Sequence, residues 1–409
     1  MAGHEHIASS GYPSIMWMRW VAQNQVRARL WYVAIRVCRL LMTQNPLSLG
    51  LIALFLMDMM PAQAQVSEKP HLIVAAESRD MIWNAVATDR ERVFVAGPRW
   101  TGARGPAVAL LNGLARAYPN VDWNNWAPGG DVTKAFVNVN ALHRDDHNGL
   151  WVIDTGSPDF GGNPLPGGAK AVRIDLATDR VDRIYPLGPQ VVLPGSYVDD
   201  IRFHGDHAYL TDAGRPGLIV LDLRTGEAHR VLDGTRAVTA SSDRPIIVDG
   251  NILRGPDGTP LKVHSDPLEV SPDGTWLYFA PLEGPWSKIE TRWLDDLSVT
   301  PETLVTKVQP WADLPPVGGT AMDANGDLYF TDLAENSLKR RTAEGTITTI
   351  VQDPRLHWVD APFIDADHAI WLPVPQLDRI ALFNGGKSNV QWPVQLFRLD
   401  LGETGSPRR

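Results

Sequence analysis

The stretch GGTAMDANGDLYFTDLAEN, residues 318–336, decides the fold of this chain. A short apolar segment leads into a turn of Asp, Asn and Gly, and a second segment rich in aromatic residues follows, which is the pattern of a β-hairpin. The same pattern recurs five more times, at 82–97 (IWNAVATDRERVFVAG), 137–156 (VNVNALHRDDHNGLWVIDTG), 197–214 (YVDDIRFHGDHAYLTDAG), 266–284 (DPLEVSPDGTWLYFAPLEG) and 359–376 (VDAPFIDADHAIWLPVPQ). Repeats spaced ~40–70 residues apart are typical of propeller blades. The sequence therefore predicts an all-β, six-bladed β-propeller.

The segments between the repeats supply the outer strands of the predicted blades. Residues 217–232 (GLIVLDLRTGEAHRVL), for example, form two β-rich runs around a turn signal. Residues 71–76 (HLIVAA) precede the first repeat and have no hairpin partner of their own. We expect them to supply the outer strand of the last blade, beside 394–401, because such closure removes the open edge of the ring. Residues 65–409 are thus predicted to be one propeller domain.

The first 64 residues have the features of a signal peptide. The apolar stretch 47–60 follows five arginines and precedes Ala62-Gln63-Ala64, a small–x–small cleavage pattern. We expect cleavage after Ala64 and a secreted or periplasmic protein, with an uncleaved anchor and an internal start at Met18 as alternatives. No later segment is apolar enough to predict a stable membrane span after cleavage.

Composition narrows the function classes. The single cysteine, Cys38, lies in the leader, so the mature chain would have no cysteine nucleophile or thiolate metal ligand. The formal net charge of −9 argues against nucleic acid as a partner. The chain contains no dinucleotide-binding fingerprint after a strand and no haem-attachment motif, so no redox cofactor is expected.

Polar residues precede the predicted inner strands, which begin at the mouth of a propeller's axial cavity. The residues expected to face the axis are Trp83, Asn84, Asn138, Asp199, Asp200, Asp266, Gly318, Gly319, Thr320 and Asp360. Converging carboxylate and amide oxygens would suit a hard cation such as Ca²⁺ or Mg²⁺. Clustered carboxylates also raise one another's pKa, which suits a general base. The alternative for Asp199, Asp200 and Asp266 is a structural role in turns.

The long Gly- and Pro-rich insertions at 98–131 and 157–196 are expected to cover this cavity. Within the first insertion, Trp123 and Trp126 are three residues apart in a segment without strand periodicity. They are interpreted either as packing for the loop or as a wall on which a ligand stacks.

Several of these motifs resemble the major royal jelly protein/Yellow family. The resemblance rests on VFVAGPRW (93–100), AYPN (117–120), LWVIDTG (150–156) and the order DDIRF, AYLTDAG, GLIVLDL within 199–223. It covers roughly residues 80–400 and implies a secreted six-bladed propeller. Insect members of that family pigment cuticle, bind biogenic amines or serve as food proteins. They usually carry disulfides, so this chain is more similar to the cysteine-free bacterial members.

A more distant resemblance is to the gluconolactonase/regucalcin propellers, which hold one divalent cation at the axis. Asn138 and Asp199 fall at polar axial positions of that family, and Asp266 falls near its Asp ligand, which also acts as a base. The first blade departs from the pattern, because Trp83 and Asn84 stand where a Glu ligand is expected.

Two functional hypotheses follow from these residues. In the first, the protein is a metal-assisted lactone or ester hydrolase, in which Asn138, Asp199 and Asp266 hold a Ca, Mn, Zn or Mg ion and Asp266 is the catalytic base. In the second, it is a non-enzymatic binding protein for a small polar or aromatic ligand. The ligand contacts would then be Trp83, Asn84, Trp123, Trp126, Thr320 and Asp360. A protein-binding scaffold is a third alternative.

Overall fold

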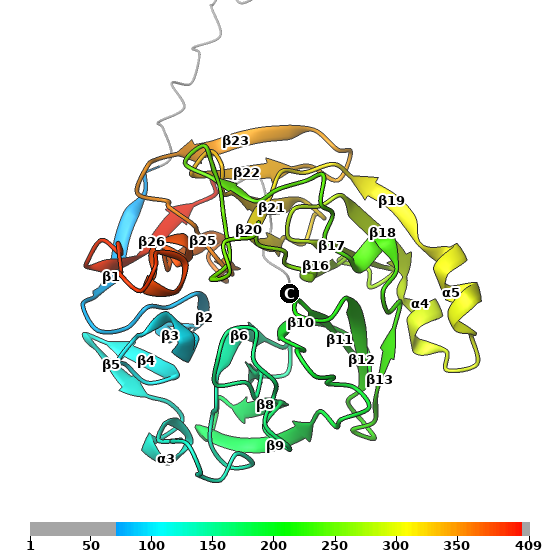
Figure 1. Ribbon diagram of the computed structural model, residues 1–409, viewed down its shortest axis with the longest axis horizontal. Helices are drawn as coiled ribbons and strands as arrows, with labels where there is room; N and C mark the ends of the chain where they lie inside the picture. The colour runs from blue at the N-terminus through cyan, green and yellow to red at the C-terminus, as the bar shows by residue number, and fades with distance from the viewer. Residues whose placement is uncertain (1–70, 403–409) are drawn as a thin grey trace, which may run out of the picture. The chain divides into compact units, whose positions relative to one another are not determined.

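A computed structural model describes residues 71–402, and these residues form six four-stranded antiparallel sheets around a common centre (Figure 1). The prediction of an all-β, six-bladed propeller is confirmed. Blades 1 to 3 consist of β2 (Ala85–Asp89), β3 (Arg92–Ala96), β4 (Val108–Asn112) and β5 (Leu114–Ala117); β6 (Val139–Arg144), β7 (Gly149–Asp154), β8 (Lys170–Asp175) and β9 (Arg180–Pro186); and β10 (Val198–His204), β11 (His207–Asp212), β12 (Gly217–Asp222) and β13 (Ala228–Val231).

Blades 4 and 5 follow the same order from the axis outward. They consist of β16 (Ser265–Val270), β17 (Trp276–Pro281), β18 (Trp286–Glu290) and β19 (Gln309–Ala312); and β20 (Val317–Met322), β21 (Leu328–Asp332), β22 (Ser337–Arg341) and β23 (Ile347–Gln352). The predicted leader, residues 1–64, lies outside the described residues, so its cleavage stays a prediction.

Blade 6 closes the ring with strands from both ends of the described chain. Its order is β24 (Phe363–Ile364), β25 (Ala369–Val374), β26 (Val394–Asp400) and then β1 (Ile73–Ser78). The pairing of β1 with β26 is antiparallel, with Ile73 opposite Arg398 and Ser78 opposite Val394. The N-terminal strand thus supplies the outer strand of the last blade, as the unpaired segment 71–76 predicts.

The core lies between neighbouring blades and follows the two-residue period of the strands. In β11, Ala208 and Leu210 pack toward blade 2 in a cluster with Trp151. The intervening Tyr209 packs in a different cluster with Leu268 of blade 4. Each middle strand is therefore buried on both faces, which explains why the second segment of every repeat is so apolar.

Four inner strands contain a register shift close to the axis. The shifts fall between Val139 and Ala141, between Val198 and Ile201, between Ser265 and Leu268, and between Val317 and Thr320. A bulge of this kind re-aims side chains and is often found beside functional sites. It determines which polar residues face the axial cavity.

Short elements interrupt the connections between strands, both within blades and between them. They are η2 (Arg99–Thr101), α3 (Val121–Asn124), η3 (Arg236–Val238), the hairpin of β14 (Ile247–Val248) and β15 (Asn251–Ile252), α4 (Thr291–Asp295), α5 (Pro301–Lys307), η4 (Leu377–Arg379) and η5 (Ala381–Phe383). The helices α4 and α5 lie on the outer rim (Figure 1). None of the helices within residues 71–402 is long and apolar enough to cross a membrane.

Candidate functional site

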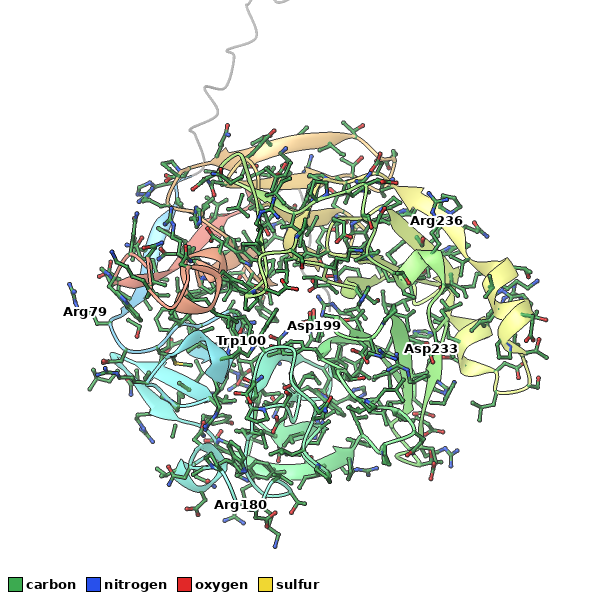
Figure 2. The ribbon with its side chains drawn as sticks, viewed as in Figure 1. Arg79, Trp100, Arg180, Asp199, Asp233 and Arg236 are labelled. Carbon is green, nitrogen blue, oxygen red and sulfur yellow. The ribbon has the colours of Figure 1, made fainter. Side chains whose placement is uncertain are left out.

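A cavity of about 360 Å³ lies where the inner strands begin, and we call it the upper cavity. Its polar wall includes Asn84, Asn140, Asp199, Asp266 and Asp360, which come from blades 1, 2, 3, 4 and 6. Its apolar wall consists of side chains from loops above the blades, namely Trp100, Phe160, Tyr197, Leu261, Val263, Leu282, Trp358, Leu377 and Phe383. Trp100 and Asp199 lie at the edge of the central opening (Figure 2).

The three carboxylates of the upper cavity are partly buried and lie near one another, which shifts their pKa values. Burial, reinforced by Asp266 and Asp360, raises the pKa of Asp199 well above its ordinary value. Burial and the neighbouring Asp360 do the same to the pKa of Asp266. Burial raises the pKa of Asp360 to about 7. Within residues 71–402, no ion pair joins these three carboxyls to a Lys or Arg, although Arg215 and Lys262 also line the upper cavity.

A chain of hydrogen bonds positions Asp199. The Trp100 indole N–H donates to the Tyr197 hydroxyl (2.9 Å), which donates to Asn140 Oδ1 (2.8 Å). Asn140 Nδ2 then donates to Asp199 Oδ1 at 2.6 Å. Asn84 Nδ2 also donates to Asn140 Oδ1 (3.2 Å). Asn84 is 2% exposed, and its Oδ1 has no hydrogen-bond partner among the described residues. A buried acceptor of this kind is costly unless something else satisfies it.

Aromatic rings cluster at the mouth of the upper cavity. The centroid of Phe160 lies 4.9 Å from Trp100, 5.4 Å from Phe383 and 6.5 Å from Tyr197. These spacings fit the edge-to-face packing that aromatic rings prefer. The rings come from three separate insertions and from the start of blade 3, so only the closed ring brings them together.

Trp358 connects the apolar wall of the upper cavity to Asp360 of the polar wall. Its indole N–H donates to Asp360 Oδ2 at 3.3 Å. Its φ of 53° lies in the left-handed region, which is unusual for a bulky side chain. Strained residues that the surrounding structure holds in place are concentrated at functional sites.

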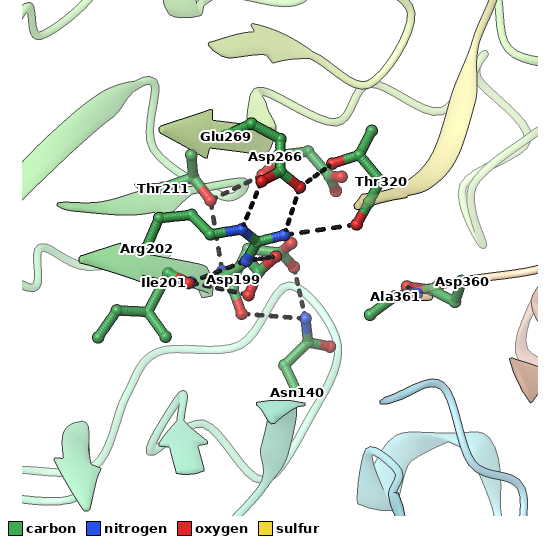
Figure 3. Close-up of polar contacts among 11 residues, drawn as sticks. Asn140, Asp199, Ile201, Arg202, Thr211, Asp266, Glu269, Thr320, Asp360 and Ala361 are labelled. Carbon is green, nitrogen blue, oxygen red and sulfur yellow. Dashed lines mark hydrogen bonds and ion pairs between the residues drawn. The ribbon is translucent and has the colours of Figure 1, made fainter. Parts of the chain in front are cut away.

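Arg202 is the centre of a buried ion network that connects blades 3, 4 and 5 (Figure 3). The Arg202 guanidinium donates to both oxygens of Glu269, at 3.0 and 2.8 Å, and to Asp200 Oδ2 at 2.7 Å. The Thr320 hydroxyl donates to Glu269 Oε1 at 3.0 Å. Arg202 and Glu269 are 5% and 2% exposed. Asp200 is therefore paired, unlike Asp199 and Asp266.

The expectation that Asn138 faces the axis needs correction. Asn138 is fully buried, its Oδ1 accepts the Arg99 backbone N–H (2.8 Å), and its Nδ2 donates to Thr155 Oγ1 (3.1 Å). Asn140, two residues later at the bulge of β6, lines the upper cavity instead. The signal was present in the sequence, because Val139-Asn140 corresponds to Val198-Asp199 and Val359-Asp360.

The predicted aromatic contacts also lie away from the upper cavity. Trp83 is 1% exposed, packs between blades 1 and 6, and donates its indole N–H to the Gln395 carbonyl at 3.2 Å. Trp123 packs on Phe136 with ring centroids 4.9 Å apart. Trp126 is buried beside a separate surface hollow. For the Trp pair, the structure matches loop packing rather than a wall around the axis.

The remaining predicted residues are Asn84, Thr320 and Asp360 as ligand contacts, and Asp199 and Asp266 as metal ligands. Asn84, Asp199, Asp266 and Asp360 all line the upper cavity, whereas Thr320 lies lower, at the ion network. Within residues 71–402, no group of three or more His, Cys, Asp or Glu side chains is arranged to hold a metal ion. The carboxylates as placed here do not form a ready-made metal site, and the divalent cation stays a prediction.

Comparisons with known proteins place the chain in a family. The family model described as "Major royal jelly protein" matches residues 137–401. Protein yellow of Drosophila subobscura is 31% identical over 121 residues, which cover 27% of this chain and 20% of that protein. Protein yellow of Drosophila melanogaster is 27% identical over 155 residues, covering 34% and 28%. The matched region thus spans less than a third of these relatives.

Some solved structures are similar to this chain at low sequence identity. A streptogramin B lyase covers 82% of this chain and 99% of its own, with 13% identity and a TM-score of 0.45. A virginiamycin B lyase from Staphylococcus aureus covers 81% and 99%, with 13% identity and a TM-score of 0.44.

Proposed function

This chain belongs to the major royal jelly protein family, and we propose that its upper cavity binds a small organic cation with a flat apolar body. The observation that carries the proposal is the combination of an aromatic wall with three carboxylates that have no ion-pair partner among the described residues, all in one cavity. Negative charge that is partly withdrawn from water is favoured by a positive partner. A ligand cation would supply the missing partner.

The aromatic wall supports an organic ligand over a bare ion. Aromatic faces attract cations and also pack on apolar rings. The volume of about 360 Å³ falls in the range of small-molecule pockets. Asn84 Oδ1 is available as an additional acceptor for a ligand N–H or O–H.

The test is stabilisation by a defined probe. In the presence of millimolar 2-phenylethylammonium, the full chain is expected to unfold at a higher temperature, because a ligand that binds only the folded state stabilises it. Trp100 and Trp358 line the cavity, so their fluorescence should change over the same concentration range. An unchanged melting temperature together with unchanged fluorescence would reject the proposal.

The affinity for the probe is expected to rise with pH. The pKa of Asp360 is raised to about 7, so its carboxyl is largely protonated at pH 6 and ionised at pH 8. The charged amine prefers the ionised form, so the association constant should increase about tenfold between these pH values. Titrations at pH 6, 7 and 8 measure this directly. Asp360→Asn should flatten the profile, and a wild-type profile that is already flat would contradict the role of this carboxyl.

The metal-assisted lactone or ester hydrolase is the second candidate, and the raised pKa of Asp266 favours it as the base. If this candidate is correct, lactone opening should be abolished by a chelator and restored by Ca²⁺, Mn²⁺, Zn²⁺ or Mg²⁺, and Asp266→Asn should be inactive with the metal present. Binding of the amine without any chelator-sensitive hydrolysis would reject the hydrolase and support the binding function. Export of the protein is a further proposal, supported by its family and by the predicted leader.

A further inference from the structure

A second cavity of about 370 Å³ lies at the opposite ends of the inner strands, and we call it the lower cavity. Its apolar wall includes Phe203, Met322, Phe363 and Ile364. Arg202 and Glu269 of the ion network line the lower cavity, whereas neither of them lines the upper cavity. The proposed function of the upper cavity does not involve it.

Two acidic side chains of the lower cavity are fully paired, and in the same way. Asp145 Oδ2 accepts the Trp151 indole N–H and the Arg173 Nε–H, each at 2.8 Å. In blade 6, Asp365 Oδ2 accepts the indole N–H of Trp371 (2.8 Å) and Nε–H of Arg398 (3.3 Å). In both blades the Trp and the Arg are directly opposite each other in the sheet. This arrangement neutralises the turn Asp.

Blade 5 departs from this arrangement. Asp323 occupies the equivalent turn position, six residues before Tyr329, which replaces the Trp. Arg340 is opposite Tyr329 in the sheet, as Arg173 is opposite Trp151. Its Nε, however, lies 3.6 Å from Asp327 Oδ2. Asp323 therefore forms no ion pair with a Lys or Arg in the part of the chain that the structure describes.

The two carboxylate oxygens of Asp323 differ in their hydrogen bonding. Asp323 Oδ1 accepts the backbone N–H groups of Asn325 (2.9 Å) and Asp327 (3.0 Å) and so holds the turn. Asp323 Oδ2 is buried and has no hydrogen-bond partner among the described residues. Its nearest basic neighbour is His368, whose Nε2 lies 3.9 Å away, too far for a hydrogen bond, and also has no hydrogen-bond partner among the described residues. Burial raises the pKa of Asp323, which reflects the unfavourable environment of this charge.

We propose that the lower cavity is a second binding site, which takes a small alkylammonium ion whose N–H groups donate to Asp323. The alkyl part packs against Phe203, Met322 and Phe363. An ammonium group supplies the charge and the donor that Trp and Arg supply in blades 2 and 6. An unpaired buried carboxylate is costly, and a ligand gives a physical reason for keeping it.

The site is tested with n-butylammonium in a background where binding at the upper cavity is weakened. Calorimetric titration of the full-length Asp266→Asn variant is expected to show one site whose affinity equals that of a site in the wild-type protein. Adding Asp323→Asn should weaken that site about tenfold or more, because a hydrogen bond to a charged group is lost. Absence of any site in Asp266→Asn, or equal binding with and without Asp323→Asn, would overturn the proposal. Loss of binding at the upper cavity alone would leave it intact.

Stability measurements separate a ligand role from a structural one. Asp323→Asn keeps Oδ1 for the turn amides and removes a buried charge, so the variant should melt at or above the wild-type temperature. The matched control is Asp145→Asn, which loses its charged bond to Arg173 and should melt lower. A clear drop in the melting temperature of Asp323→Asn would show that Asp323 stabilises the fold, and would reject its role as a ligand contact.

Discussion

Replacing Asp266 by asparagine is expected to weaken 2-phenylethylammonium binding by about 10- to 100-fold, since a hydrogen bond to a charged partner contributes about 1.5 to 3 kcal/mol. The Asp266 carboxylate accepts no hydrogen bond among the described residues, and only its backbone carbonyl is bonded, to Thr211 (2.8 Å). The substitution therefore removes charge from the upper cavity and breaks no bond within the fold.

The same substitution is expected to stabilise the protein without ligand. Because the folded-state pKa of Asp266 is raised, its contribution to stability is complete at low pH and is lost as pH rises through that value. An asparagine side chain does not titrate. At pH 8 we therefore expect the free energy of unfolding of Asp266→Asn to be about 1 kcal/mol higher than that of the wild type. This value is reduced to allow for the partial exposure of the side chain. Urea titrations at pH 5 and pH 8 measure the difference.

The neighbouring Asp200 is the matched control for this prediction. It is paired with Arg202 at 2.7 Å, so Asp200→Asn should lower stability and affect amine binding less. Equal binding by wild type and Asp266→Asn would show that the upper cavity does not recognise charge.

Replacing Arg202 by methionine is expected to produce the largest loss of stability, about 3 to 5 kcal/mol, because removing one partner of a buried ion pair leaves the other charge uncompensated. Both Glu269 and Asp200 lose their partner in this variant. The free energy of unfolding from urea titration at pH 7 is the measurement.

Two further variants make this result specific. Arg202→Met combined with Glu269→Gln should be less destabilised than Arg202→Met alone, since the second change removes one stranded charge. Arg224 is also near an Asp, at 3.5 Å, but its side chain is 70% exposed, so Arg224→Met should change stability by less than about 1 kcal/mol. Similar losses of unfolding free energy in the Arg202 and Arg224 variants would mean that the ion network does not behave as a buried ion cluster.

The blade count and the closing strand were predictable because they depend on local patterns. Each repeat carries its own apolar alternation and turn, and segment 71–76 is β-rich without a nearby partner. The placement of Asp199, Asp266 and Asp360 on the cavity wall follows from their position at the strand starts. Their roles as ligands or base stay predictions.

The remaining features depend on geometry that local patterns do not encode. The bulge in β6 places Asn140, and not Asn138, on the wall of the upper cavity. The aromatic wall combines Trp100, Phe160 and Phe383, which lie on loops far apart in the sequence, and their paths depend on packing above the closed ring. The Arg202 network was also missed, because pairing with Glu269 across two blades leaves no trace in either repeat alone.

The most direct test of the central claim compares a cation with its neutral counterpart in the same calorimetric titration at pH 8. The full-length wild-type protein should bind 2-phenylethylammonium at the upper cavity and bind 2-phenylethanol, which has the same shape without the charge, at least about tenfold more weakly. Equal affinity for the two compounds, or no binding of either, would contradict the view that the unpaired carboxylates of the axis are there to receive a cation.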